Sequence, residues 1–223
     1  MWKQKALVVG LCLMLFLAGF WKNGEAWEAD ADVEADIGEE KRIAITFDDG
    51  PHRLYTPKLL DGLKERGIPA TFFLVGENIE NNEELVKRMA EEGHLIGNHT
   101  FSHVQLTKKK KEEACREVRL TNERICALTG APVLYIRPPY GSWSEELQEE
   151  IPMTVTLWNL DSEDWKSQNT GKIVELVESE AEEGSIILMH DIFDTSVEAA
   201  LRIVDDLTAQ GYTFVTVDEL LLD

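Results

Sequence analysis

Strand-like and helix-like segments alternate along this chain from about Lys41 to its C-terminal end. Seven short apolar segments have the length and composition of buried strands, and amphipathic segments of helical period separate most of them. The predicted strands cover residues 43–47, 69–75, 94–98, 133–136, 154–160, 185–189 and 213–217. Strands that alternate with helices are typical of a parallel α/β sheet, and seven of them favour a closed or nearly closed barrel. We therefore predict a single α/β domain over residues 41–223.

The first 26 residues have the pattern of a secretory signal. Two lysines precede an apolar run, and Gly24-Glu25-Ala26 offers small residues at the two positions that define a cleavage site. If it is not cleaved, the apolar run at residues 6–21 would anchor the protein in a membrane. We predict a signal peptide or anchor over residues 1–26, a flexible acidic linker over residues 27–40, and a secreted or extracytoplasmic domain after them.

The chain is strongly acidic, with 42 Asp and Glu against 22 Lys and Arg and a formal net charge of −20. Such a charge repels the phosphates of nucleic acids and anionic membrane surfaces. We therefore expect no nucleic-acid partner, membrane contact only through the N-terminal segment, and a neutral or cationic substrate. We also expect the protein to be a monomer.

Two cysteines, Cys115 and Cys126, fall in the longest predicted helix, residues 108–128. Eleven residues of helix separate two Cα atoms by about 16 Å, well beyond the roughly 7 Å that a disulfide tolerates. We predict two free thiols, buried or partly buried. The other predicted helices cover residues 56–66, 82–92, 144–149, 170–183 and 195–210.

Two adjacent carboxylates, Asp48 and Asp49, follow the first predicted strand and precede the turn at Gly50-Pro51. Neighbouring like charges repel, so the fold must place a cation or hydrogen-bond donors beside them. In a parallel α/β barrel, the loops after the strands converge on one face. The polar and aromatic residues that follow the other predicted strands are therefore candidate partners: His99, His103, Arg137, Tyr140, Asp161, Asp164, Trp165, His190 and Asp191.

The spacing of His99 and His103 would place the two imidazoles one helical turn apart, where both can bind one ion. Such a pair also occurs on ordinary protein surfaces. A carboxylate from another strand end would complete three protein ligands and leave positions open for water, as in catalytic zinc sites. Asp49 is the natural third ligand, which leaves Asp48 to take a proton from the metal-bound water.

The remaining candidates each have two interpretations. His190 is either a hydrogen-bonded core histidine or, with a carboxylate beside it, a general acid. Arg137, which stands between an apolar strand and a Pro-Pro turn, either forms a surface ion pair or orients Asp48 by a charge-assisted hydrogen bond. Tyr140 and Trp165 are either core residues or flat rings that suit the apolar face of a sugar.

Five stretches of the sequence resemble, in order, the motifs of the polysaccharide deacetylases, the NodB-homology or carbohydrate esterase family 4 group. They are Thr46-Phe47-Asp48-Asp49-Gly50, His99-Thr100-Phe101-Ser102-His103, Arg137-Pro138-Pro139-Tyr140-Gly141, Asp161-Ser162-Glu163-Asp164-Trp165 and Leu188-Met189-His190. The resemblance covers essentially all of residues 41–223. It implies a distorted (β/α) barrel and a divalent metal, usually zinc with cobalt or another divalent ion as alternatives, held by Asp49, His99 and His103.

The same resemblance implies a role for each remaining matched residue. Asp48 resembles the general base and His190 the general acid. Arg137 resembles the residue that positions the base, and Asp164 the one that tunes the acid. Three further residues resemble parts of the substrate pocket, namely the oxyanion-binding N–H, the wall on the acid side and the pocket of the acetyl methyl: Tyr140, Trp165 and Leu188.

The activity that this resemblance implies is the metal-dependent removal of N-acetyl groups from N-acetylglucosamine-containing polysaccharide, with release of acetate. Peptidoglycan and chitin-like oligomers are the candidate substrates of an extracytoplasmic enzyme of this kind. Two alternatives remain: an esterase that removes O-acetyl groups from xylan or similar glycans, and an inactive carbohydrate-binding relative.

Overall fold

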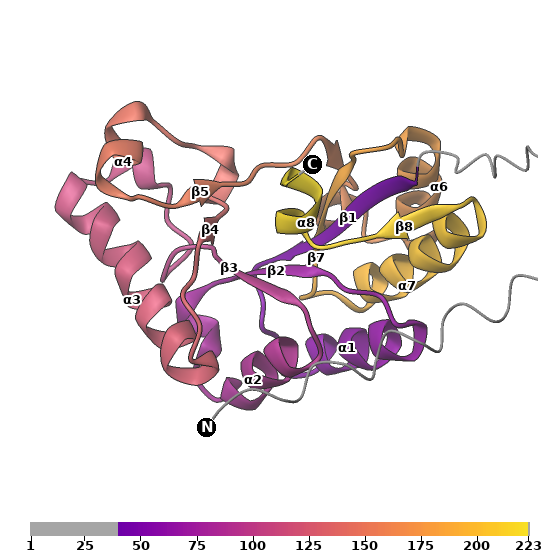
Figure 1. Cartoon of the computed structure of the whole chain (residues 1–223), viewed down its shortest axis with the longest axis horizontal. Helices are drawn as coiled ribbons and strands as arrows, with labels where there is room; N and C mark the ends of the chain where they lie inside the picture. The colour runs from indigo at the N-terminus through magenta and orange to yellow at the C-terminus, as the bar shows by residue number, and fades with distance from the viewer. Residues whose placement is uncertain (1–39, 223) are drawn as a thin grey trace, which may run out of the picture. The chain divides into compact units, whose positions relative to one another are not determined.

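Parallel strands build the central sheet of the protein (Figure 1). The computed structural model describes residues 40–222. The strands of the sheet are β1 Lys41–Asp48, β2 Thr71–Leu74, β3 Leu95–Asn98, β4 Tyr135–Ile136, β5 Thr154–Val155, β6 Leu160–Asp161, β7 Ile186–His190 and β8 Tyr212–Phe214. They pair in the order β5-β4-β3-β2-β1-β7-β6, and β8 pairs with the first residues of β1.

The sheet curls into a half-barrel, which confirms the predicted distorted (β/α) barrel of about seven parallel strands in one domain. Among residues 40–222, no pairing joins the edge strands β5 and β6, so the barrel stays open between them. The C-terminal ends of β1, β3, β4, β6 and β7 lie next to the five motifs, because each motif begins in or directly after one of these strands.

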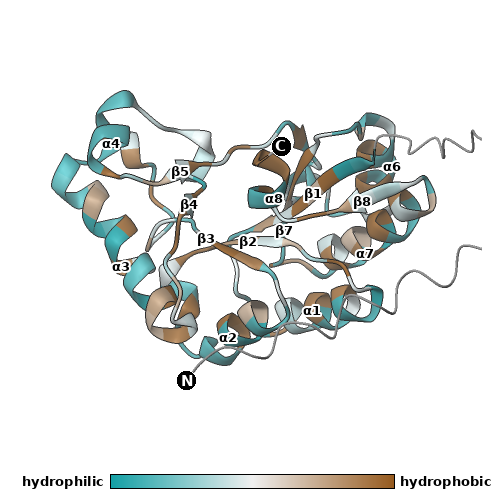
Figure 2. Ribbon diagram, in the orientation of Figure 1, coloured by the Kyte–Doolittle hydropathy of each residue, from teal (hydrophilic) through white to brown (hydrophobic). Residues whose placement is uncertain are grey.

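Helices cover the outside of the curled sheet. They are α1 Tyr55–Arg66, α2 Glu83–Glu91, α3 Lys111–Thr129, α4 Glu145–Glu150, α5 Asp164–Ser167, α6 Thr170–Glu180, α7 Asp194–Ala209 and α8 Val217–Leu221, with 3-10 turns η1 Gly76–Ile79, η2 Leu106–Lys108 and η3 Pro139–Gly141. Neighbouring helices pack against one another in the order α3, α2, α1, α7 and α6. In Figure 2 these helices carry both brown and teal residues, as one buried and one exposed face require.

The two faces of β1 explain how a buried strand can present polar side chains. Ile43, Ile45 and Phe47 belong to the large core beneath the helices. The intervening residues point to the other face because side chains alternate along a strand. There Thr46 and Asp48 are buried inside the half-barrel. The interior of the curled sheet is therefore partly polar next to the strand ends.

One predicted strand is wrong as a single element. Residues 154–160 form two short strands, β5 and β6, at opposite edges of the sheet. The connecting residues pass across the open side of the half-barrel, and the carbonyls of Thr156 and Leu157 accept hydrogen bonds from Arg137 instead of from a strand. The apolar composition of the segment could not show that its two ends pair with different neighbours.

Two short helices were not predicted. The α5 helix lies within the fourth motif, and α8 takes up the end of the predicted strand at residues 213–217. Thr216 caps α8, and Glu219 completes a capping box with it. The Thr-x-x-Glu pattern is a helix-start signal that was present in the sequence.

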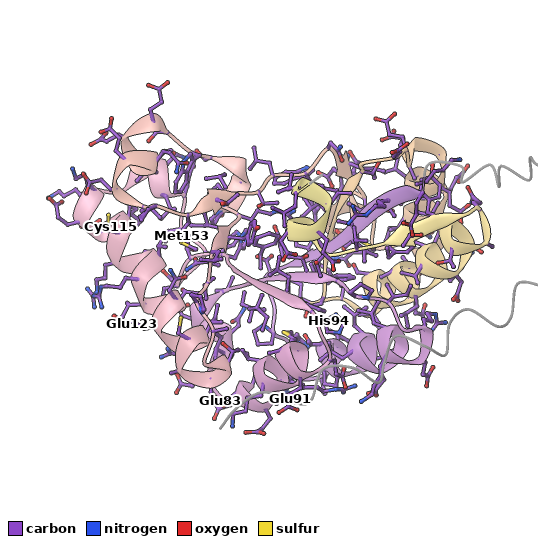
Figure 3. The ribbon with its side chains drawn as sticks, in the orientation of Figure 1. Glu83, Glu91, His94, Cys115, Glu123 and Met153 are labelled. Carbon is purple, nitrogen blue, oxygen red and sulfur yellow. The ribbon has the colours of Figure 1, made fainter. Side chains whose placement is uncertain are left out.

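Both cysteines are free and half-buried on α3, as predicted. Cys115 lies toward the start of this helix, and Glu123 further along it (Figure 3). Of the helices that the structure describes, none has the length and apolar character needed to cross a membrane. The predicted signal or anchor at residues 1–26 lies outside the described residues, as does nearly all of the predicted linker.

Gly97 on β3 is expected to be a point where the fold tolerates no side chain. A Cβ atom there would overlap the ring of Phe73 and lie 3.2 Å from the carbonyl oxygen of Tyr135. We expect Gly97→Ala to lower the free energy of unfolding by about 1–3 kcal/mol, the usual cost of overpacking. Denaturant unfolding measures it.

Gly171 provides the matched control, because it lies on α6 and a Cβ atom added there would have only Asn169 within 4 Å. Gly171→Ala should leave stability unchanged or raise it by up to about 1 kcal/mol. Equal stability of the two variants would contradict the packing described for β3.

Candidate active site

The candidate site lies where β1 and its neighbours end. Asp48 on β1 and His190 on β7 are partners in the parallel register, so their Cα atoms lie on adjacent strands at the same level. His99 follows β3, and Arg137 follows β4, where its N–H donates to the carbonyl of Asn98. The pairing of the strands therefore brings together residues that are up to 142 positions apart in the sequence.

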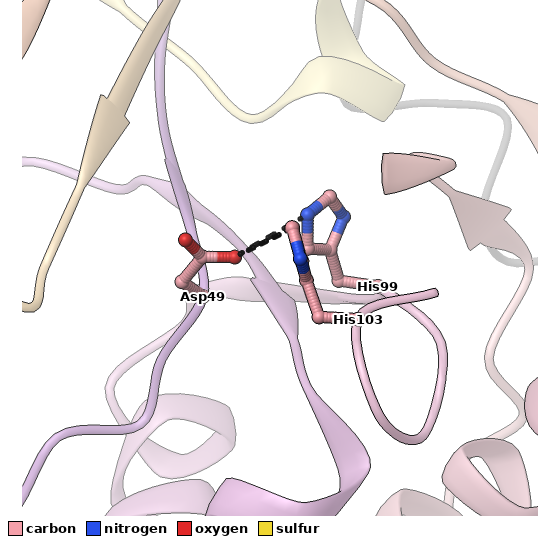
Figure 4. Close-up of side chains that lie close together, drawn as sticks. All are labelled: Asp49, His99 and His103. Atoms are coloured by element: carbon pink, nitrogen blue, oxygen red, sulfur yellow. Dashed lines mark ion pairs between the residues drawn. The ribbon is translucent and has the colours of Figure 1, made fainter. Parts of the chain in front are cut away.

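Asp49, His99 and His103 form a cluster with the geometry of a metal site (Figure 4). Asp49 Oδ1 lies 3.5 Å from His99 Nε2 and 3.2 Å from His103 Nε2. The three candidate ligand atoms all lie within 4.8 Å of one another. Oδ1 is buried without a hydrogen-bond partner among the residues that the structure describes. An unpaired buried carboxylate oxygen facing two imidazole nitrogens suits a divalent cation.

The hydrogen bond of His99 Nδ1 determines which nitrogen of the ring can bind a metal. His99 Nδ1 lies 2.6 Å from the carbonyl oxygen of Arg137, which can only accept, so this nitrogen carries the proton. Nε2 is therefore left with a free lone pair. Burial lowers the pKa of His99 below its ordinary value, which favours the neutral ring that a metal needs.

The two histidines meet through a loop and not through a helical turn, so the predicted helical spacing is wrong. Their ring centroids lie 5.0 Å apart. The backbone takes left-handed conformations at Thr100, with φ of 66°, and at His103, with φ of 51°. The Glu117 carboxylate of α3 accepts the N–H groups of Phe101 and Ser102, between the two histidines, and so holds the loop.

Asp49 is held in a left-handed conformation, with φ of 72°, at the start of the turn after β1. The Asn78 side chain donates to its carbonyl oxygen at 2.7 Å. This conformation turns the chain between the two neighbouring aspartates, so their side chains have different partners. Asp48 is 3 % exposed and bonded to Arg137, whereas Asp49 is more exposed and faces the histidines.

Arg137 is fully buried and pairs with Asp48. Its Nη1 donates to Asp48 Oδ1 at 2.9 Å and to Thr46 Oγ1 at 2.7 Å. The guanidinium also lies over the ring of Phe73, 4.3 Å from the centroid. Burial lowers the pKa of Arg137, while the charge and the hydrogen bond of Asp48 oppose that shift. The cation that the adjacent carboxylates require is thus Arg137, and it contacts only the first of them.

His190 and Asp164 form a second buried pair. His190 Nδ1–H donates to Asp164 Oδ1 at 2.7 Å, and the backbone N–H of His190 donates to Oδ2 at 2.8 Å. Burial alone would lower the pKa of His190, but the hydrogen bond and charge of Asp164 outweigh it, and with Asp48 and Asp49 they raise this pKa to about 9. The other ring nitrogen of His190, Nε2, is free to carry the second proton, and it lies 4.0 Å from Asp49 Oδ2.

The three residues expected to line a substrate pocket lie around this centre in different ways. Tyr140 is 68 % exposed, and its hydroxyl lies 3.5 Å from His103 Nδ1. Trp165 is 52 % exposed, and its backbone N–H donates to Asp164. Leu188 is buried on β7. Within residues 40–222, no hydrogen bond, ion pair or ring contact links the side chains of Trp165 or Leu188 to the metal-ligand cluster.

Asp191 follows His190 directly in the sequence but does not bond to its ring. Asp164, not Asp191, holds the His190 ring. The Asp191 carboxylate is fully buried, accepts a hydrogen bond from the Thr56 hydroxyl and packs against Gly50, the residue after Asp49. Burial raises the pKa of Asp191 to about 7. It therefore ties the end of β7 to the turn after β1.

Thr46 and Glu117 were missed in the sequence. Thr46 Oγ1 accepts from Arg137 and donates to the Ile187 carbonyl at 2.6 Å. A threonine between two apolar residues of a buried strand was the available signal for it. Glu117 gave none, because an acidic residue on an amphipathic helix usually faces solvent.

Comparison with known proteins gives one family. Residues 35–155 match the profile of the family described as polysaccharide deacetylase. The peptidoglycan-N-acetylglucosamine deacetylase PgdA of Listeria monocytogenes is 43 % identical over 180 residues, which cover 81 % of this chain and 39 % of PgdA. The peptidoglycan-N-acetylmuramic acid deacetylase PdaC of Bacillus subtilis is 42 % identical over 181 residues, with the same two shares. The chain thus spans about two fifths of the length of these relatives.

Solved structures agree with the sequence comparison. The structure of PdaC from Bacillus subtilis superposes with a TM-score of 0.80, and covers 81 % of this chain and 90 % of the solved one. The Xyl-CE4 domain of a multidomain xylanase, from the hindgut metagenome of Trinervitermes trinervoides, superposes with a TM-score of 0.76 at 34 % identity, and covers 82 % and 90 %. Since the profile matches more than half of the sequence, this chain belongs to the polysaccharide deacetylase family.

Proposed function

We propose that this chain is a metal-dependent deacetylase that removes N-acetyl groups from the N-acetylglucosamine units of peptidoglycan and releases acetate. The observation that carries the proposal is the convergence of the Asp49, His99 and His103 cluster with two hydrogen-bonded pairs, Asp48–Arg137 and His190–Asp164. Peptidoglycan as the polymer is supported by the names of the relatives. Chitin-like oligomers offer the same N-acetyl group.

The ligand cluster suits zinc first, and cobalt or another divalent ion as alternatives. Two imidazole nitrogens and one carboxylate oxygen are a ligand set typical of catalytic zinc, in which positions stay open for water and substrate. A metal bound there would polarise the acetyl carbonyl and lower the pKa of a coordinated water.

Asp48 is the proposed general base. Its Oδ1 accepts a hydrogen bond from Arg137, which fixes the orientation of the carboxylate. Its Oδ2 lies 3.7 Å from His99 Nε2 and so faces the ligand cluster, where the attacking water would lose its proton. Arg137 is thus a positioning residue, because it acts through Asp48.

His190 is the proposed general acid. Asp164 accepts the Nδ1 proton, which holds the ring in one orientation and leaves Nε2 to donate to the departing amine. The pKa of about 9 keeps this ring protonated at neutral pH, as a general acid requires.

Three residues would shape the place of the acetyl group and sugar. We assign the oxyanion-binding N–H to Tyr140, next to His103. Trp165 would line the acid side, because it follows Asp164 directly and half of its surface is exposed. Leu188 would bound the methyl group from β7, two residues before His190.

A second candidate function is the removal of O-acetyl groups from xylan or a similar glycan. The likeness to a domain of a xylanase favours it. The same residues would serve, since an ester carbonyl also needs a polarising cation, a base and an oxyanion donor.

Acetate release from three substrates tests the proposed function. The zinc-loaded protein should release acetate from peptidoglycan and from N-acetylglucosamine oligomers, and the release should stop when a chelator removes the metal and return when zinc is restored. Release from acetylated xylan alone would replace the proposal with the esterase. Release from none of the three, by protein with zinc bound, would support an inactive carbohydrate-binding relative.

The rate of acetate release is expected to have a bell-shaped pH dependence. The rate falls at high pH, where His190 loses its proton, and at low pH, where a reaction that needs an ionised base slows. The His190 pKa of about 9 is the upper limit of the alkaline limb, because the positive charge of a metal beside Asp49 would lower this pKa. Asp164→Asn removes the charge that raises it, so the alkaline limb should move down by at least about one pH unit.

Measurements of kcat/KM between about pH 5 and pH 10 check this expectation. Asp161→Asn is the matched control, because Asp161 is a nearby carboxylate that bonds to the backbone of Glu163 and not to His190. A rate that rises steadily to high pH, or a limb that Asp164→Asn leaves in place, would count against His190 as the acid.

A further inference from the structure

A run of four lysines, Lys108–Lys111, interrupts the acidic surface of this protein. All four are exposed. Lys111 Nζ lies 2.5 Å from Glu150 Oε1 and is thereby neutralised. The side chains of Lys108, Lys109 and Lys110 form no ion pair or hydrogen bond with any residue in the described range 40–222. We call these three residues the lysine ridge.

Acidic residues outnumber basic ones by 42 to 22 in this chain, yet the three consecutive ridge lysines have no carboxylate partner within residues 40–222. Two lysines elsewhere in that range, Lys41 and Lys172, also have none, but they are not part of a lysine run. Four other lysines lie 2.7–2.9 Å from a carboxylate: Lys58, Lys64, Lys87 and Lys166. Glu112 and Glu113 follow the ridge on the first turn of α3, yet neither carboxylate comes within 4.0 Å of a ridge ammonium. Three neighbouring positive charges therefore remain for an external anion.

The ridge lies at the end of the loop that carries His99 and His103, two of the three candidate metal ligands. Lys108 is five residues beyond His103, and five residues of chain span at most about 18 Å. Thr107, directly before the ridge, has its hydroxyl oxygen 2.7 Å from the Ser142 hydroxyl oxygen. Ser142 is two residues after Tyr140, whose ring contacts His103 with centroids 5.1 Å apart.

The start of the ridge is fixed and not a loose tail. Leu106, within η2, is fully buried in the core. Gln105 Nε2 donates to Ser142 Oγ at 3.0 Å, so two neighbouring side chains of this segment contact the Tyr140 loop. A polymer that places an acetyl group at the ligand cluster would thus have a cationic surface close to its path.

We propose that the lysine ridge binds the carboxylates of an anionic acetylated glycan, and so selects carboxylate-bearing peptidoglycan over neutral oligomers. This inference rests on the proposed deacetylase function. It also revises the expectation of a neutral or cationic substrate, which followed from the net charge of −20. An overall acidic protein repels an anionic polymer at long range, and three unpaired lysines beside the site offset that repulsion locally.

We infer carboxylates, and not sugar hydroxyls, as the partner because the ridge offers positive charges without a fixed arrangement of hydrogen-bond donors. Lysine ammonium groups on flexible stems act as point charges, whereas hydroxyl recognition uses planar donors and aromatic faces. Muramic acid, which the name of PdaC contains, is a sugar whose carboxyl group is ionised wherever no peptide is attached to it. Phosphate-containing wall polymers offer the same charge, so the peptidoglycan used must be free of them.

The test compares two triple variants of the full, zinc-loaded chain on two substrates. One variant changes the ridge: Lys108→Gln, Lys109→Gln and Lys110→Gln. The matched control makes the same change of charge on α1, α2 and α6: Lys58→Gln, Lys87→Gln and Lys172→Gln. Each is assayed with soluble peptidoglycan fragments, free of phosphate polymers, and with neutral N-acetylglucosamine oligomers.

For peptidoglycan fragments at low salt, we expect the ridge variant to raise KM about 3- to 10-fold with kcat unchanged, as the loss of three exposed charge contacts implies. For the neutral oligomers its KM should stay within about twofold of the wild-type value. The difference on peptidoglycan should largely disappear at about 0.5 M salt, which screens exposed charges. The control triple variant should match the wild type throughout.

Several results would overturn the inference: an unchanged KM on peptidoglycan, an equal rise of KM on both substrates, or an equal effect of the control variant. If the ridge variant binds more weakly than the wild type only to peptidoglycan that still contains phosphate polymers, and equally well to the purified fragments, the ridge binds phosphate instead. Sedimentation of the proteins with insoluble peptidoglycan measures binding without turnover. This binding measurement tests the role of the ridge by itself. Activity on the neutral oligomers tests the deacetylase function separately.

Discussion

The buried ion pair of Arg137 and Asp48 is the interaction on which the rest of the site depends. A guanidinium that is 0 % exposed loses its hydration, which costs several kcal/mol unless the protein replaces it. Here Asp48, the Thr46 hydroxyl, two carbonyls of the β5–β6 connection and the face of Phe73 replace the water. The carbonyl of the same arginine accepts the Nδ1 proton of His99. One residue therefore orients the candidate base and a candidate metal ligand together.

Arg137 also contacts the segment that crosses the open side of the half-barrel. The segment between β5 and β6 crosses from one edge of the sheet to the other, and two of its carbonyls point to Arg137 instead of to a strand. Asp164 lies just beyond β6, where it reaches back to His190 on β7. Residues near both edges of the open sheet, Arg137 after β4 and Asp164 after β6, thus meet around the ends of β1 and β7.

The sequence predicted which residues meet at the strand ends better than it predicted the local conformation of the loops that carry them. The aspartates, histidines and arginine stand directly after apolar segments, and parallel strands bring such positions to one face. The geometry of the histidine loop depends instead on positive φ angles at Thr100 and His103 and on the Glu117 carboxylate. Threonine, a β-branched residue, rarely adopts a positive φ, so the loop conformation could not be predicted at Thr100 without its tertiary contacts. Likewise, no local signal showed that residues 154–160 pair at opposite edges.

The central claim is that two adjacent carboxylates do different work: Asp49 holds the metal and Asp48, bonded to Arg137, accepts the proton. The most direct measurement is the zinc content of purified Asp48→Asn together with its rate of acetate release. The account predicts about one zinc per chain, as in the wild type, and a rate lower by at least about 100-fold, as loss of a general base implies. Loss of zinc with the activity would make Asp48 a ligand, and a retained rate would leave the reaction without its proposed base.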